Sequence, residues 1–230
     1  MTQTPEELLK QGEEQYKARH FAKAKKSFQD LIETYPTSSM MADARYFKGM
    51  CLYNQQAYDD AIVDFRLVTE RYPANQWADD AQLQIGLCNL RKAPYIQLDQ
   101  NMTKQALLDL YTVIDDYPES DRIADVYAAI DDARNRLAEK DFLIGKFYER
   151  RGNFKSAIIY LQSIIKDYDT FKSIADVYLH LAFCQNKSGQ LDPARSNYQR
   201  IIDLYPESKA AARARKELGK LPKTVQEGNG

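Results

Sequence analysis

The sequence predicts an all-α fold made of repeated helix pairs, and two observations carry that prediction. A Tyr-Pro or Tyr-Asp pair begins at residues 35, 72, 117, 168 and 205, at intervals of 37, 45, 51 and 37 residues. Recurrence at such intervals indicates a repeat architecture. Set in register, the pairs end five gapless segments of 17 residues: "HFAKAKKSFQDLIETYP", "AYDDAIVDFRLVTERYP", "MTKQALLDLYTVIDDYP", "NFKSAIIYLQSIIKDYD" and "QLDPARSNYQRIIDLYP".

Three columns of this alignment form one apolar stripe. The fifth column is always Ala, the ninth is bulky, the twelfth is a branched aliphatic residue, and the Tyr follows four residues later. Spacings of 4, 3 and 4 residues fall on one face of a helix, so each segment is predicted to bury this stripe. The members are Ala24, Ala61, Ala106, Ala157 and Ala194; Phe28, Phe65, Leu110, Leu161 and Tyr198; and Leu31, Val68, Val113, Ile164 and Ile201.

Each segment is expected to be the second helix of a pair. Proline ends it, because proline lacks an N–H and disfavours the α conformation of its predecessor. A small residue lies twelve positions before the Ala in four copies and twenty before it in the third, where eight residues are inserted around "KAPYIQLDQN". We expect the two small residues to face each other and let the helices approach closely. The small residues before the Ala are Gly12, Gly49, Gly86, Gly145 and Ala182.

This pattern resembles the tetratricopeptide repeat (TPR), whose helix pairs stack into a superhelix. The usual Trp of the first helix is absent, and Arg45 stands in its place in the second copy. The fold class predicted is therefore a TPR-like α-solenoid of five helix-turn-helix repeats over residues 5–220. Fourteen extra residues precede the fourth copy, without a proline or other break before Gly152, and they predict one long helix over about 120–150.

The long helix is expected to join an N-terminal sub-bundle, about 5–118, to a C-terminal one, about 119–220. A capping helix is expected near 207–219, followed by a disordered tail at 221–230. Net charge is −1 with a pI of about 6.2, so we expect no nucleic-acid partner. No apolar run approaches the ~18–20 residues of a membrane span, and the polar residues 1–20 do not resemble a signal peptide.

Residues with catalytic or metal-binding potential do not form a recognisable site. Cys51, Cys88 and Cys184 occupy the same slot of three repeats, which favours a small buried packing position over a disulfide or metal ligand. His20 and His180 have no Cys or carboxylate partner at ligand spacing. No H-E-x-x-H, paired C-x-x-C or phosphate-binding glycine loop is present. We therefore expect neither an enzyme nor a cofactor.

A binding surface is the alternative, and in stacked helix pairs the first helices line the groove. Register selects a largely apolar and aromatic set on these helices, edged by polar side chains that could hold a ligand backbone or carboxylate. Sealing of the repeats is the competing interpretation of the same residues. The set is Leu9, Glu13, Tyr16 and Lys17; Asp43, Tyr46, Met50, Tyr53 and Asn54; and Leu83, Leu87, Leu90 and Arg91.

The run from 102 to 169, and above all "RNRLAEKDFLIGKFYERRGNF", resembles the BamD family of the bacterial β-barrel assembly machinery. The resemblance implies a periplasmic lipoprotein, tethered to the outer membrane, that helps to fold and insert β-barrels. It also implies that the N-terminal repeats receive the C-terminal targeting segment of an unfolded barrel protein. The C-terminal repeats would dock on the POTRA domains of BamA, beside the other assembly lipoproteins.

Register assigns five residues to the docking role: Tyr148, Arg150, Arg151, Phe154 and Tyr160. The first cysteine, Cys51, lies inside a predicted helix, so the lipid anchor is expected from the family and absent from this chain. Two alternatives remain open at this point. One is a periplasmic TPR protein of the Tol–Pal or cell-division kind, and the other is a cytosolic co-chaperone that binds acidic peptide ends.

Overall fold

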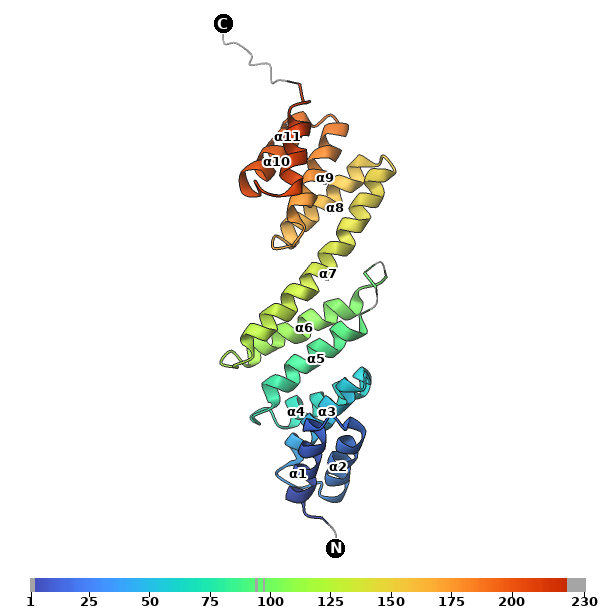
Figure 1. Ribbon diagram of the computed structural model, residues 1–230, viewed down its shortest axis with the longest axis vertical. Coiled ribbons are helices and arrows are strands. Elements are labelled where there is room, and N and C mark those ends of the chain that lie inside the picture. Colours follow the sequence, from blue (N-terminus) through green and yellow to red (C-terminus); the bar gives the residue numbers. More distant parts are fainter. Residues whose placement is uncertain (1–2, 94, 97, 223–230) are drawn as a thin grey trace. The chain divides into compact units, whose positions relative to one another are not determined.

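The computed structural model describes residues 3–93, 95–96 and 98–222, and in that part of the chain it contains eleven α-helices and no strand (Figure 1). It divides into two compact units, Met1–Ala133 and Arg134–Gly230, called here the N-terminal and C-terminal units. The helices are α1 Pro5–Lys17, α2 Phe21–Thr34, α3 Met41–Asn54, α4 Tyr58–Arg71, α5 Ala78–Lys92, α6 Asn101–Asp116, α7 Ile123–Arg150, α8 Phe154–Asp167, α9 Ile174–Lys187, α10 Leu191–Leu204 and α11 Lys209–Leu218.

The predicted long helix is confirmed as α7, and the division between the units falls inside it. In the N-terminal unit, α1 to α6 form three successive helix pairs, and each pair packs on the next. Residues from the start of α7, including Val126 and Ile130, complete the core of the third pair. In the C-terminal unit, the rest of α7 packs with α8 to α11 around one core.

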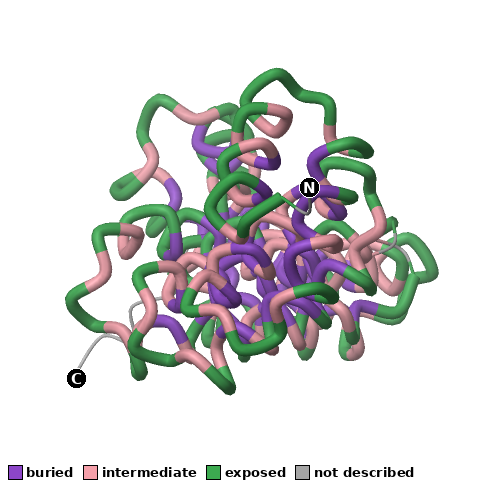
Figure 2. The backbone as a smooth tube through the Cα atoms, turned by 90° about the horizontal axis from the view of Figure 1, so that it is seen from below, coloured by how far each residue is buried: buried purple, intermediate pink, exposed green. Residues whose placement is uncertain are grey.

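The predicted stripe is confirmed in every copy. All fifteen side chains of the fifth, ninth and twelfth columns have zero relative exposure. Figure 2 shows buried and exposed segments alternating along the helices. Burying a large aliphatic or aromatic side chain stabilises a fold by roughly 1.5–3 kcal/mol, so these columns are the main source of cohesion within each pair.

The partner of the small residue is corrected by the structure. A Cβ placed on Gly49 would lie 2.7 Å from Cε1 of Phe65, and one on Gly12 would overlap the ring of Phe28 in the same way. The glycine therefore faces the bulky ninth column rather than the Ala of the fifth. The bulky side chain occupies the space where a Cβ of the first helix would lie. A small residue on the first helix therefore goes together with a large residue in the ninth column.

The tyrosine of each repeat is the residue that closes its helix. In all five copies it is half-buried and stands directly after the last helical residue. Its N–H donates to the carbonyl of the twelfth column, as Tyr72 does to Val68 at 2.9 Å. Its own carbonyl accepts from the residue three positions on, which turns the chain into the next pair. One of the last carbonyls of each helix is thus satisfied at the point where the helix ends.

The eighth column, next to the bulky one, contacts the first helix of its own repeat. In four repeats this contact is polar, and in the fourth the rings of Tyr148 and Tyr160 stack with centroids 5.6 Å apart. Polar partners of this kind fix the register of a helix pair, because a shift would leave buried groups unpaired. The polar contacts join Gln15 to Ser27 (3.0 Å), Arg45 and Lys48 to Asp64 (3.0 and 2.9 Å), Asn89 to Asp109 (2.6 Å) and Gln185 to Asn197 (2.8 Å).

The ends of the helical array depart from the expectation in one respect. Leu221 lies within the predicted tail, yet it is buried in the core of the C-terminal unit. Residues 223–230 of that tail lie outside the described residues. Among the described residues, none of the helices combines the length and the hydropathy needed to cross a bilayer.

Candidate functional site

The first helices of the N-terminal unit are linked side by side near their C-terminal ends. Asn54 Nδ2 on α3 lies 3.5 Å from the hydroxyl of Tyr16 on α1, at the limit of a hydrogen bond. Arg91 Nε on α5 donates to the hydroxyl of Tyr53 on α3 at 3.3 Å. This bond raises the pKa of Arg91, while burial raises the pKa of Tyr16. Tyr16 therefore remains neutral at neutral pH, and the guanidinium of Arg91 remains charged.

Asn54 has capacity left for a ligand. Its amide nitrogen also donates to the carbonyl of Met50 at 2.8 Å, which fixes the side chain against its own helix. Its Oδ1 receives no hydrogen bond from the described part of the chain, and the residue is exposed. An amide held in this way can accept a hydrogen bond from an extended peptide N–H.

Ten of the thirteen predicted surface residues are at least partly accessible. Lys17, Asn54 and Arg91 are exposed, and the other seven, among them Tyr16, Met50, Tyr53 and Leu87, are half-buried. The result is an apolar strip with cationic and amide edges, which we call the first-helix surface. It consists of Tyr16, Lys17, Met50, Tyr53, Asn54, Leu87 and Arg91.

The structure corrects the prediction at three positions. Tyr46, Leu83 and Leu90 are buried, with Leu83 fully inaccessible, so they belong to the core and not to a binding surface. Tyr46 is covered by Trp77, whose ring stacks on it with centroids 4.6 Å apart and planes 7° from parallel. Both α3 and α5 have neighbours before and after them in the array, so more of each helix is buried than the register of one repeat suggests.

Trp77, the sole tryptophan, was not identified from the sequence. It directly precedes α5, and its Nε1 donates to Oδ1 of Asp43 on α3 at 2.6 Å. Asp43, predicted to face a ligand, is thus engaged in holding one repeat to the next. The available signal was a lone Trp shortly after a Tyr-Pro pair.

The predicted docking residues lie together at the junction of α7 and α8 in the C-terminal unit. The Tyr148–Tyr160 stack replaces the polar contact that the other repeats make at the eighth column. Arg151 lies 5.2 Å above the ring of Phe147, which is 45% exposed and was not predicted. Phe154 instead points inward to Phe183, with centroids 6.2 Å apart. Arg150 is exposed at the end of α7.

The cysteines and His180 have different surroundings. All three thiols are fully buried, which raises the pKa of each to about 12 and confirms their packing role. His180, in contrast, does have a carboxylate partner, since its Nδ1 lies 2.6 Å from Oε2 of Glu149. Cys184 Sγ donates to the same oxygen at 3.7 Å. The described residues nevertheless contain no group of three or more His, Cys, Asp or Glu able to hold a metal ion.

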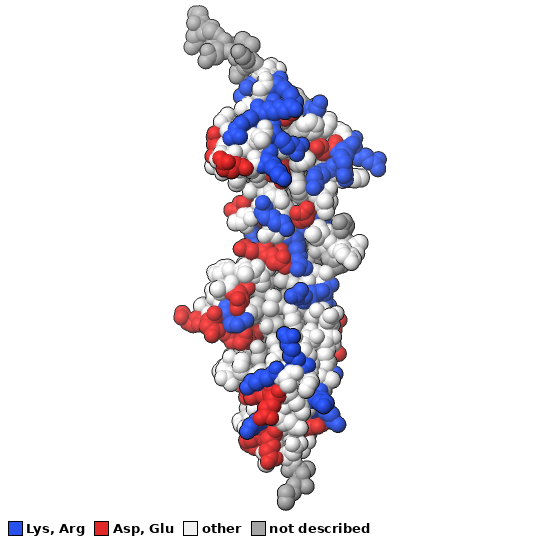
Figure 3. All heavy atoms as spheres, in the orientation of Figure 1, with Lys and Arg blue, Asp and Glu red and all other residues white. Residues whose placement is uncertain are grey.

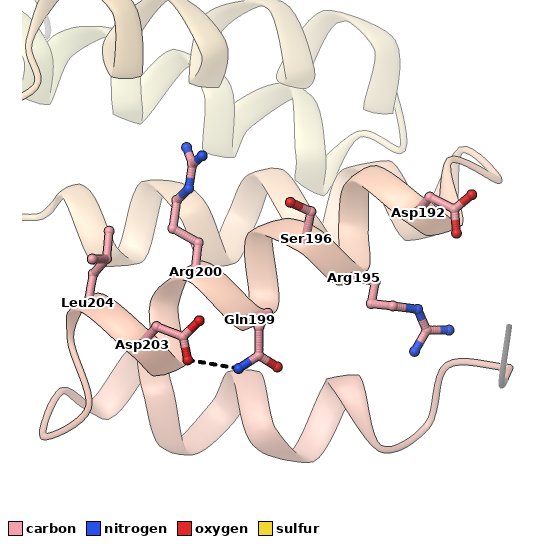
Figure 4. Close-up of a pocket in the computed structure, with 7 residues that line it drawn as sticks. All are labelled: Asp192, Arg195, Ser196, Gln199, Arg200, Asp203 and Leu204. Atoms are coloured by element: carbon pink, nitrogen blue, oxygen red, sulfur yellow. Dashed lines mark hydrogen bonds between the residues drawn. The ribbon is translucent and has the colours of Figure 1, made fainter.

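A surface hollow of about 570 Å³ runs along α10 (Figure 4). Most of its polar side chains are engaged within the chain: Gln199 donates to Asp203 at 2.8 Å, and Arg195 donates to the carbonyl of Pro222. Arg200 points to the opposite side in the figure and donates to the hydroxyl of Tyr178 at 3.2 Å. This hollow therefore offers little chemistry to a ligand.

Comparison with known proteins decides the family. A family model described as YfiO, outer membrane lipoprotein, matches residues 1–192. The chain belongs to the YfiO family. Curated relatives of this YfiO-family chain carry the name outer membrane protein assembly factor BamD, which confirms the resemblance found in the sequence.

The relatives are distant and longer. The BamD proteins of Caulobacter vibrioides, Xylella fastidiosa (strain 9a5c) and Rickettsia prowazekii are 25%, 27% and 23% identical over 74%, 76% and 83% of this chain. The chain spans 56%, 63% and 76% of their respective lengths.

Solved structures confirm the TPR-like fold. A TPR repeats protein from Bacteroides fragilis matches 95% of this chain over 99% of its own, with a TM-score of 0.55 and 12% identity. The TPR2AB domain of yeast Sti1, from its complex with a pHSP90, matches 94% of this chain over 84% of its own, with a TM-score of 0.50 and 17% identity.

Proposed function

We propose that this YfiO-family chain is a non-catalytic outer membrane protein assembly factor that receives unfolded β-barrel proteins and docks on a membrane-bound partner. The family match over residues 1–192 is the observation that carries the proposal, together with relatives named as assembly factors. The fold supports it, since a helical repeat array presents extended surfaces for protein segments.

The client would bind at the first-helix surface as a short extended peptide, the C-terminal segment of a barrel protein. The half-buried rings of Tyr16 and Tyr53 and the side chains of Met50 and Leu87 would contact its apolar or aromatic residues. Asn54 Oδ1 would accept a backbone N–H, and Arg91 or Lys17 would meet the terminal carboxylate. No covalent step is involved, so any directionality would come from partners and from the folding of the client.

The partner would dock at the α7–α8 junction of the C-terminal unit, and we propose the POTRA domains of BamA for this role. Exposed Phe147, the Tyr148–Tyr160 stack and the cations Arg150 and Arg151 combine aromatic area with charge, as interface centres do. Phe154 contributes only indirectly, by packing behind this surface.

We further propose attachment to the periplasmic face of the outer membrane through a lipidated cysteine, in keeping with the lipoprotein description of the family. The three cysteines of this chain are fully buried within α3, α5 and α9, so none of them is suited to carry the lipid.

Fluorescence anisotropy with a labelled peptide that copies the last strand of an outer-membrane barrel tests the client role. We expect saturable binding, no binding of a scrambled peptide, and about tenfold weaker binding by Tyr53→Ala, the loss typical of a buried interface ring. Tyr111→Ala is the matched control, because Tyr111 is 41% exposed on α6, outside the proposed surface. Equal affinity of the two variants would refute the site.

The docking role is tested separately by biolayer interferometry against immobilised BamA POTRA domains. Arg151→Ala combined with Phe147→Ala should weaken binding by about tenfold or more, because the two substitutions together remove one exposed cation–aromatic pair. Lys166→Ala, an exposed change at the far end of α8, should leave the affinity unchanged. Undiminished binding by the double variant would refute docking at this junction.

A further inference from the structure

The C-terminal unit contains a cavity of about 470 Å³ that neither proposed role uses. It lies among the end of α7, α9, α10 and α11, away from the hollow along α10. Apolar and charged side chains both line it. The lining residues are Glu149, Leu179, His180, Phe183, Tyr198, Arg213, Lys216, Glu217 and Lys220.

Tyr198 is the anomaly of this cavity. It occupies the bulky ninth column, where the other four repeats carry Phe or Leu, so packing alone does not call for a hydroxyl. The side chain is fully buried, and its hydroxyl has no hydrogen-bond partner among the described residues. An unpaired buried hydroxyl costs about 1–3 kcal/mol, which a partner in the cavity would recover.

The hydroxyl is suited to donate a hydrogen bond to an anion. Burial raises the pKa of Tyr198 to about 12, helped by the nearby charges of Glu217 and Glu149 and opposed by Arg213. The group therefore stays protonated at neutral pH. The positive charge of Arg213 acts on this hydroxyl, and the guanidinium of Arg213 can bind the same anion.

The charges around the cavity leave one cation in excess. Lys220 pairs with Glu217 at 2.6 Å, and Glu149 pairs with His180. Arg213 and Lys216 lie three residues apart on α11, and neither side chain makes a hydrogen bond or ion pair within the described part of the chain. Among the Lys, Arg, Asp and Glu side chains of the lining, three cations face two carboxylates. Figure 3 shows Lys and Arg gathered near the C-terminal end of the chain.

We propose that this cavity binds a single carboxylate presented by a peptide segment of another protein. One negative charge balances the cationic excess, whereas a dianionic phosphate would exceed it. The volume is far larger than a carboxylate needs, and Leu179 and Phe183 offer apolar walls for the residue that carries it. Tyr198 would donate to one oxygen, and Arg213 and Lys216 would hold the other at the mouth.

Titrations of the full chain, followed by ¹⁵N–¹H correlation spectra, test the proposal. N-acetylglycine represents a chain end, N-acetylglutamic acid α-amide represents an acidic side chain, and N-acetylglycinamide is the neutral match. We expect saturable shifts of α9 and α11 amides with at least one carboxylate and none with the neutral amide. The tighter carboxylate identifies the source. Tighter binding of inorganic phosphate, or equal shifts with the neutral amide, would overturn the proposal.

Three variants place the site. Tyr198→Phe and Arg213→Gln should each weaken carboxylate binding about tenfold, the loss expected for a charge-assisted hydrogen bond. Lys209→Gln, with the same charge change on α11 outside the cavity, should bind as the parent does. Tyr198→Phe should also melt no lower than the parent, because the hydroxyl it removes is unpaired. Unchanged affinity in Tyr198→Phe and Arg213→Gln would show that the cavity is not the site.

Discussion

Gly49→Ala tests whether close approach of the helices, rather than flexibility, explains the glycine of each first helix. The new Cβ would lie 2.7 Å from Cε1 and 2.9 Å from Cδ1 of Phe65, well inside ordinary van der Waals contact at 3.4–4 Å. Phe65 is fully buried, with Tyr46 beside it at a centroid distance of 6.0 Å, so the ring has little room to move.

Two opposing effects set the magnitude. Alanine in place of glycine inside a helix stabilises it by about 1 kcal/mol. Overpacking a well-packed core costs about 1–3 kcal/mol, and an overlap with a rigid ring belongs in the upper part of that range. We therefore expect Gly49→Ala to lose about 1–2 kcal/mol of unfolding free energy.

Gly145→Ala is the matched comparison. Its Cβ would lie 3.2 Å from the flexible side chain of Leu161, which can shift by a few tenths of an ångström. This variant should range from unchanged to about 1 kcal/mol more stable. Urea unfolding followed by circular dichroism measures both variants, and fluorescence of the single Trp77 follows the core that holds Gly49. A Gly49→Ala protein as stable as its parent would refute the steric explanation.

Three further outcomes are expected. Asp64→Asn should lose about 1–3 kcal/mol in urea unfolding, because Arg45 and Lys48 lose a buried carboxylate; an unchanged midpoint would count against that ion-pair cluster. Asp43→Ala should shift the emission of Trp77 to the red and lower stability by about 1 kcal/mol, since the indole N–H loses its acceptor; unshifted emission would contradict this. Burial raises the pKa of the three thiols from 9.0 to about 12. Between these pH values the thiols of the unfolded chain lose protons that the folded chain keeps, so the free energy of unfolding should fall as pH rises from about 9 to about 12. A variant with all three cysteines replaced by Ala should lose that part of the pH dependence in urea midpoints, and an identical profile would exclude the thiols as its cause.

The core could be predicted from the sequence because each repeat supplied an independent copy of the same pattern. Fifteen column positions agreed on one buried face, so no single substitution could obscure it. The burial of residues on the opposite face of a central helix could not be predicted in the same way. Leu83 sits at a register position that is open in an isolated pair, but neighbouring helices close over it in the array.

Contacts between first helices of successive repeats were also beyond the sequence pattern. His180 and Glu149 are 31 residues apart, on α9 and α7, and they meet only because one first helix packs beside the next. Trp77 reaches back to α3 in the same way. Spacing rules describe one helix at a time, whereas these contacts depend on the lateral offset between helices.

The residue in the eighth column differs from repeat to repeat, and this difference affects which helices pair with each other during folding. With identical apolar columns throughout, the second helix of one repeat could settle on the first helix of another, a hazard of repeat arrays. Such an exchange would set Asn197 against Arg45 and Lys48, and would leave Asp64 beside a neutral Gln185. Each orphaned buried group would cost about 1–3 kcal/mol. In each of the five helix pairs, the second helix therefore fits its own first helix better than the first helix of another repeat. To remain stable, an engineered protein with the repeats in a different order has to keep each helix pair intact.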